Sequence, residues 1–348
     1  MKIHPQHSTR ILGICLALAA MLYAATCLPA GEDGDPPTYK AEVLHVTETE
    51  NEIKAFAPGS KQYDVRIRLN SGADSGTEAV IVHRTLNNPA FDIHPQEGDR
   101  LIVRAEGTGY AISDYDRLPA ILLLLLGFSA LLILFGGRTG AKALLVLLFA
   151  VLLIAKGLIA LILLAPAHIL LWTILIGAAI TLATQLIVNG RNVKSAGAII
   201  GTVGGILIAA LLALLVIHCA YLTGIDEEQA GMLKALYLKD VDFRDLLFAG
   251  IVLGALGAVM DVAVSIASAQ YEMKQLAPRT NFQTLVASGL SVGRDVMGTM
   301  ANTLVLAYIG GALPLLLLIS AQPDLPLLHV MNLNMIATEI ARSLIGSI

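Results

Sequence analysis

The sequence has few charged residues, few aromatic residues and few cysteines. Only 14% of its 348 residues are charged and 5% are aromatic, whereas 56% are hydrophobic. This composition is typical of an integral membrane protein. The formal net charge of -4 gives no basis for nucleic-acid binding.

The three cysteines, Cys15, Cys27 and Cys219, all lie in or beside apolar segments. This placement excludes a disulfide framework, and thiolate-metal spacings are absent from the sequence. No glycine-rich phosphate loop precedes a helix, because GTVGG at 201–205 lies inside an apolar run. We therefore predict a protein that is not an enzyme and carries no cofactor.

An apolar run at 11–30 follows a short head that carries Lys2 and Arg10. A positive flank before such a run is typical of a signal anchor or of a cleaved signal peptide. Leu28 stands where a small residue would precede a cleavage site, which favours an uncleaved anchor over 1–30 and hence a first transmembrane helix.

Residues 31–117 are polar and have the alternation of β-strands. In KQYDVRIRLN at 61–70, Tyr63, Val65, Ile67 and Leu69 alternate with polar residues, as in a half-buried strand. Shorter runs at 39–43, 77–84 and 99–105 indicate further strands, so a small all-β domain, barrel-like or a sandwich, is expected. His45, His83 and His94 lie here without metal-ligand spacing and are interpreted as surface histidines.

From 118 to 348 the chain is predicted to be a transmembrane helical domain. Its apolar runs are 118–136, 143–164, 169–188, 195–217, 246–269 and 298–319, each near the ~20 residues that span a bilayer. With the anchor they predict a bundle of about seven transmembrane helices.

The charges of the loops predict the orientation of this bundle. Lys and Arg gather in the loops that are cytoplasmic if the N-terminus is cytoplasmic, and the opposite link at 225–245 is acidic. We therefore expect a multi-pass protein of the plasma membrane with residues 31–117 extracytoplasmic. Two further segments, 281–296 and 332–348, are amphipathic and could lie along the interface; the first could instead re-enter the membrane.

Two stripes of polar residues interrupt the last apolar runs at helical spacing. Each begins with an aspartate, and an ionised carboxylate in hydrocarbon costs several kcal/mol, so it normally faces protein, water or a cation. We expect the stripes to face each other across one cavity that forms a cation or proton pathway. Its predicted residues are Asp261, Ser265, Ser268, Asp295, Thr299 and Asn302.

Other interpretations of these aspartates stay open. Asp261 could be a structural carboxylate bonded to a neighbouring helix, and Asp295, beside Arg294, could form an interfacial ion pair. A protease dyad needs two carboxylates that share a proton, but Asp295 is placed nearer the cytoplasmic end of its helix than Asp261. The identity of any bound metal stays unknown.

The strings GAVMDVAVSIASAQYEM (257–273) and GRDVMGTMANTLVLAYIGG (293–311) resemble the two signature regions of the YibE/F family of bacterial membrane proteins. The resemblance covers roughly 118–348 and implies a multi-spanning, transporter-like protein, without an established activity to transfer. Family members usually continue after a segment like TEIARSLIGSI into a further apolar helix, whereas this sequence stops at Ile348.

Two functions are carried forward. The first is a permease for a small solute or ion of unknown identity, working in the lipid bilayer as a monomer or homo-oligomer. The second is a non-transporting partner or scaffold, with the β-domain docked on an envelope or secretion assembly.

Overall fold

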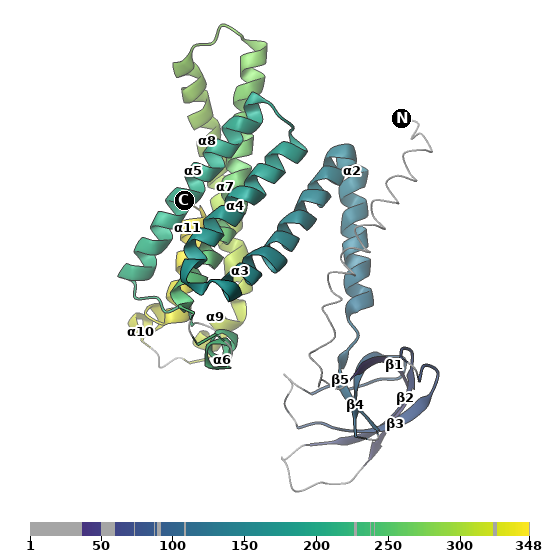
Figure 1. The fold of residues 1–348 in the computed structure, drawn as a ribbon. Coiled ribbons are helices and arrows are strands. Elements are labelled where there is room, and N and C mark those ends of the chain that lie inside the picture. Colours follow the sequence, from purple (N-terminus) through teal and green to yellow (C-terminus); the bar gives the residue numbers. More distant parts are fainter. Residues whose placement is uncertain are drawn as a thin grey trace, which may run out of the picture. The chain divides into compact units, whose positions relative to one another are not determined.

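In the computed structural model the chain divides into two compact units, one up to Phe135 and one from Gly136 onward. Figure 1 shows the fold of each unit. Residues 1–30, the expected anchor, lie outside the described residues. The structure describes residues 37–49, 60–72, 74–86, 88, 92–107, 109–225, 228–236, 238–239, 241–322 and 326–347.

The first unit contains one antiparallel sheet of five strands in the order β3-β2-β1-β4-β5. The alternation at 61–70 is confirmed, because Val65, Ile67 and Leu69 are fully buried while Arg66 and Arg68 are exposed. The last strand, β5, was not among the named runs. The strands are β1 (Thr38–Thr49), β2 (Gln62–Leu69), β3 (Glu78–Arg84), β4 (Arg100–Glu106) and β5 (Gly109–Tyr115).

The three histidines of the sheet have separate partners. His45 Nδ1 pairs with Glu97, and His83 Nε2 lies 2.8 Å from the carbonyl oxygen of Ile93. His94 meets the Tyr63 ring edge-on, with 6.3 Å between the ring centroids. In the described part of the chain, no three His, Cys, Asp or Glu side chains form a group that could hold a metal ion.

The rest of the described chain is helical. Its long helices are α2 (Leu118–Leu152), α4 (Ile169–Val188), α5 (Val193–Cys219), α7 (Phe243–Leu276) and α8 (Phe282–Gly311). The shorter elements are η1 (Leu153–Leu158, a π-helical turn), α3 (Ile159–Leu164), η2 (Pro166–His168), α6 (Glu228–Leu236), α9 (Leu313–Ser320), α10 (Leu327–Met331) and α11 (Asn334–Ser347).

Within the described residues, four helical segments are long and apolar enough to cross a membrane, or five if α8 and α9 count as one bent span. The predicted runs 118–136 and 143–164 fall in one helical stretch of 47 residues. At about 1.5 Å per residue this stretch is far longer than a bilayer is thick. It is interrupted at Gly137, whose φ of 54° and ψ of -128° are not helical. The count of seven is thus not reached among the described residues.

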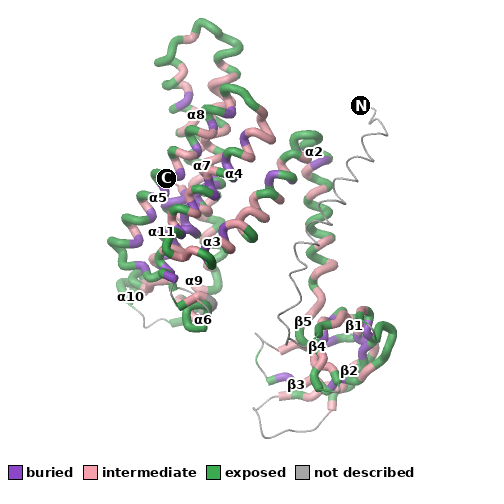
Figure 2. Tube along the Cα trace, viewed as in Figure 1, coloured by how far each residue is buried: buried purple, intermediate pink, exposed green. Residues whose placement is uncertain are grey.

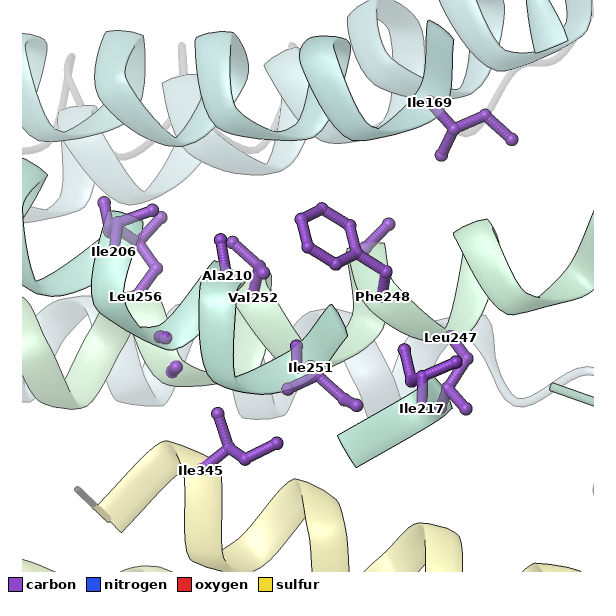
Figure 3. Packing of buried hydrophobic residues seen from close by; sticks show 14 of the residues in the cluster. Ile169, Ile206, Ala210, Ile217, Leu247, Phe248, Ile251, Val252, Leu256 and Ile345 are labelled. Carbon is purple, nitrogen blue, oxygen red and sulfur yellow. The ribbon is translucent and has the colours of Figure 1, made fainter. Parts of the chain in front are cut away.

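The core of the second unit lies where α4, α5 and α7 meet (Figure 3). Phe248, Ile251 and Val252 of α7 pack there beside Ile206 of α5, and each is at most 2% exposed. Outside this core the helices expose large apolar side chains, as a lipid-facing surface requires. The exposed positions along these helices are green in Figure 2.

The two segments that were predicted to be amphipathic have different structures. Residues 281–296 are not a separate surface helix, because α8 runs without interruption from Phe282 through Asp295 to Gly311. Residues 332–348 do contain an amphipathic helix, α11, which packs on α7 and α8 and buries Ile336, Ala341 and Ile345. Ile340 and Leu344 stay exposed, so tertiary packing takes up only part of the hydrophobic face that the sequence suggested for the interface.

Candidate functional site

The orientation of Asp261 follows from close packing between α5 and α7. Glycines of α5 repeat every fourth residue and allow the α7 backbone to approach, a small-residue pattern typical of membrane helices. A Cβ added to Gly205 would lie 2.4 Å from Val259 Cγ1, and one added to Gly201 would lie 3.4 Å from Ala263 Cβ. Asp261 follows Val259 by two residues, or about 200° around the helix, so it points away from α5.

The orientation of Asp295 follows from equally close packing between α7 and α8. A Cβ on Gly289 would lie 2.1 Å from Gln270 Nε2, and one on Gly293 would lie 3.2 Å from Ile266 Cδ1. Gln270 Nε2 also donates a hydrogen bond of 3.1 Å to the carbonyl oxygen of Leu285. Asp295 follows Gly293 by two residues and is therefore turned away from α7.

A tight turn joins α7 to α8 and fixes this antiparallel pair. Lys274 Nζ donates to the carbonyl oxygen of Thr280 at 2.8 Å. Asn281 caps α8, because its Oδ1 accepts a hydrogen bond of 2.8 Å from the backbone N–H of Thr284. The α7–α8 pair is thus a helical hairpin with a defined register.

The predicted polar residues do not enclose a cavity between the two stripes. Asp261, Ser265, Asp295, Thr299 and Asn302 are exposed, and Ser268 is half-buried. The expectation that the stripes face each other across the hairpin is therefore wrong for a single chain. We call these six residues the outward face.

The structure does bring the two aspartates to similar depth. Gly289 contacts Gln270 and Gly293 contacts Ile266, so each residue further along α8 lies level with one residue earlier in α7. In this register Asp295 is level with Val264. Asp261 is three residues from Val264, or roughly 4.5 Å along the axis. The depth difference expected from the sequence is not found, because α8 begins more than three turns before Asp295.

The hydroxyls and carboxylates of the outward face differ in hydrogen bonding. Ser268 Oγ donates to the Val264 carbonyl oxygen at 2.7 Å, and Thr299 Oγ1 donates to that of Val296 at 2.9 Å. Neither Asp261 nor Asp295 has a hydrogen-bond or ion-pair partner among the described residues. The carboxylates are therefore free to bind a cation, a proton or another polar surface.

On the other side of the hairpin lies an apolar cavity of about 310 Å³ between α5, α7, α8 and the end of α11. Val262, Ile266, Met297 and Met300 line it together with Gly201 and Gly205. No residue of the outward face lines this cavity. A polar pathway through it is not supported.

Sequence reasoning missed a polar group where α11 meets the hairpin. A Cβ on Gly254 of α7 would lie 2.8 Å from the Tyr308 hydroxyl of α8, and one on Gly346 of α11 would lie 4.0 Å from it. In α11, Thr338 is fully buried, and its hydroxyl has no hydrogen-bond partner among the described residues. The tyrosine within the signature string at 293–311 was the only sequence signal for this contact.

The comparisons with known proteins identify the family. The family model described as YibE/F-like protein matches residues 124–348, which is more than half of the chain, so the chain belongs to this family. The suspected resemblance is thereby confirmed. No curated protein and no solved structure matches the chain.

Proposed function

We propose that this member of the YibE/F-like family is a permease that moves a small solute or ion across the plasma membrane. The observation that carries the proposal is the pair of carboxylates, Asp261 and Asp295, at similar depth in apolar helices and without partners among the described residues. Intramembrane carboxylates of this kind commonly mark ion pathways and proton relays.

Each residue of the outward face has a proposed part in this pathway. Asp261 binds the transported or coupling cation, or carries the proton. Asp295 supplies a second carboxylate, and Thr299 and Asn302 supply neutral oxygen ligands of the kind that hard cations prefer. Ser265 and Ser268 extend the polar surface along α7. No catalytic step is proposed.

The proposed orientation places the N-terminus in the cytoplasm and residues 31–117 outside it. The acidic link at 225–245 then lies on the outer side, and the basic turn with Lys274 and Arg279 lies on the inner side, as the distribution of Lys and Arg favours. In this orientation the sheet domain is extracytoplasmic and the turn between α7 and α8 is cytoplasmic.

The second candidate is a non-transporting membrane partner. It is favoured by the separate five-stranded domain, which offers a docking surface, and by hydroxyls of Ser268 and Thr299 that already bond to their own backbone. In this case the outward face would serve helix association alone.

The substitution Asp261→Asn distinguishes the two candidates, because it keeps shape and hydrogen bonding but removes the charge. We expect Asp261→Asn to abolish rescue of a deletion phenotype at normal membrane abundance. Ser265→Ala, which removes a hydroxyl from the same face but no charge, should weaken rescue only mildly. Rescue by Asp261→Asn at the level of the unmodified protein would refute the permease and leave the polar residues as packing groups.

A further inference from the structure

The outward face is incomplete in a single chain. α7 is long and apolar enough to cross a membrane, and α8 is so together with α9, from which it is bent by 61°. Each of α7 and α8 carries an exposed aspartate. A carboxylate turned to hydrocarbon costs several kcal/mol, so another polar surface must cover it. The question is which surface that is.

The polar residues of both helices lie on one side of the hairpin. The opposite side is the one that packs on α5, since residues of α5, α7 and α8 line the apolar cavity between them. Asp261, Ser265, Asp295, Thr299 and Asn302 are all absent from that lining and are exposed. They therefore form one continuous surface across two antiparallel helices.

We infer that a second copy of this chain covers the outward face. Two copies inserted with the same orientation keep every residue at its depth only if their two-fold axis lies along the membrane normal. Such an axis places α7 of one copy opposite α8 of the other. The interface is therefore decided by which residues of α7 and α8 share a depth.

The register of the hairpin makes this surface self-complementary. The contact of Gly293 with Ile266 sets the register of the two helices. When equal numbers of residues are counted from it along α7 and α8, Asp261 lies within one residue of the level of Thr299. Ser265 likewise lies within one residue of the level of Asp295. In the pair, the partner residue nearest in depth to Asp295 is thus Ser265. The one nearest to Asp261 is Thr299, whose hydroxyl already donates to the Val296 carbonyl oxygen, and the partner's carboxylate lies roughly 4.5 Å further along the axis. Asn302, one turn beyond Thr299, adds two amide donors.

The unused hydrogen-bonding capacity supports the same arrangement. Asp261 and Asp295 are acceptors, and Ser265 and Asn302 are donors, and none of these four has a hydrogen-bond partner among the described residues. Asp295 and Ser265, a free acceptor and a free donor at nearly the same depth on one surface, are the kind of pair that a symmetric, isologous interface requires.

Other apolar segments of the chain match the surface poorly. Residues 11–30 and 118–136 contain no charged residue. Lys156 lies in the π-helical turn η1, whose Ile154 shares a cavity with Leu253. Lys156 follows Ile154 by two residues and is exposed, so its side chain is turned away from the cavity that Ile154 shares with Leu253 and Met260 of α7.

One part of the inference rests on the proposed function: that the surface shared by the two copies is the transport pathway. Two facing copies would enclose this pathway between their polar residues. The pairing itself follows from burial and register and would also apply to a non-transporting protein.

The test is cross-linking between two differently tagged copies that are expressed together in the membrane. Cys15, Cys27 and Cys219 are first replaced by serine. One copy then carries Ser265→Cys and the other Thr299→Cys, which leaves both carboxylates intact. A short bis-maleimide reagent should join the two tags.

The matched control carries Ile200→Cys with Thr299→Cys. Ile200 is 74% exposed on α5, and its neighbour Gly201 contacts Ala263, so it has a depth close to that of Ser265. We expect at least about tenfold more cross-linked product from the Ser265 pair than from the Ile200 pair. Equal yields from the two pairs would overturn the inference. So would a protein that is monomeric in lipid nanodiscs.

Transport and pairing can fail separately in this design. Loss of cross-linking while Asp261-dependent rescue persists would refute the pairing and leave the permease standing. Specific cross-linking in a protein that Asp261→Asn does not impair would refute the permease and support the pairing.

Discussion

A single methyl group at Gly205 should separate α5 from α7, whereas the same group one residue earlier should not. A Cβ added to Gly205 would lie 2.4 Å from Val259 Cγ1, well inside van der Waals contact. At Gly204 an added Cβ would meet nothing within 4 Å. Gly205→Ala and Gly204→Ala are therefore a matched pair that differs in steric overlap.

The expected magnitude follows from the stiffness of the neighbour. Val259 is β-branched and in a helix it has one strongly preferred χ1 rotamer, so the overlap is relieved by moving the helices apart. Overpacking of this kind costs typically 1–3 kcal/mol. Gly204→Ala should be neutral, or should stabilise by up to about 1 kcal/mol, through helix propensity.

The assay is unfolding by SDS in mixed micelles. Trp172 of α4, the only tryptophan in the chain, packs against the hydrophobic core of the second unit and supplies the fluorescence signal. The difference between the two variants gives the steric cost, because both replace glycine by alanine in the same helix. Every 1.4 kcal/mol corresponds to a tenfold change in the unfolding equilibrium.

The double variant Gly205→Ala/Val259→Ala tests the mechanism. Removing Val259 Cγ1 removes the atom that clashes, so the two substitutions should interact favourably by about 1 kcal/mol or more in a double-mutant cycle. If Gly205→Ala is as stable as Gly204→Ala, or if Val259→Ala gives no rescue, the packing that turns Asp261 outward is wrong.

Three further predictions concern the sheet domain, the orientation and a helix cap. Burial lowers the pKa of His83 below its ordinary 6.5 despite the hydrogen bond to Ile93, so the stability that neutral His83 provides is present above pH 6.5 and lost as the pH falls below it. The hydrogen-exchange protection factors of β2 and β3, which correct for the slower intrinsic exchange at low pH, should fall on acidification, and less so in His83→Gln. In intact cells an impermeant maleimide should label Asp64→Cys but not Lys142→Cys; the reverse pattern would invert the proposed orientation. Asn192→Ala should destabilise α5 by about 1 kcal/mol in the same SDS assay, because Asn192 Oδ1 accepts the Ser195 N–H at 2.8 Å.

Local patterns in the sequence predicted the elements well. The alternation at 61–70 identified β2 and its buried side, because one face of a strand must be apolar when it covers a core. The apolar runs 169–188 and 195–217 correspond closely to α4 and α5. Both patterns depend only on neighbours along the chain.

The sequence was less informative where elements join or break. A helix that continues from a polar into an apolar segment has no composition signal at the junction, so residues 281–296 were separated from the rest of α8. The interruption at Gly137 is a backbone conformation that glycine tolerates, and many other glycines in the apolar runs are helical. The buried hydroxyl of Thr338 depends on how α11 packs, which periodicity does not specify.

The candidate site, too, could be predicted only in part from the sequence. Helical spacing correctly placed Asp261 with Ser265 on one side of α7, and Asp295 with Thr299 on one side of α8. Spacing alone could not say which way those sides turn, because orientation depends on where α5 and the glycines of α8 make contact. Once Gly205 and Gly293 fix those contacts, both polar stripes must turn outward. The cavity expected within one chain is then replaced by an interface that needs a second polar surface, and the hairpin register makes a copy of the same chain that surface.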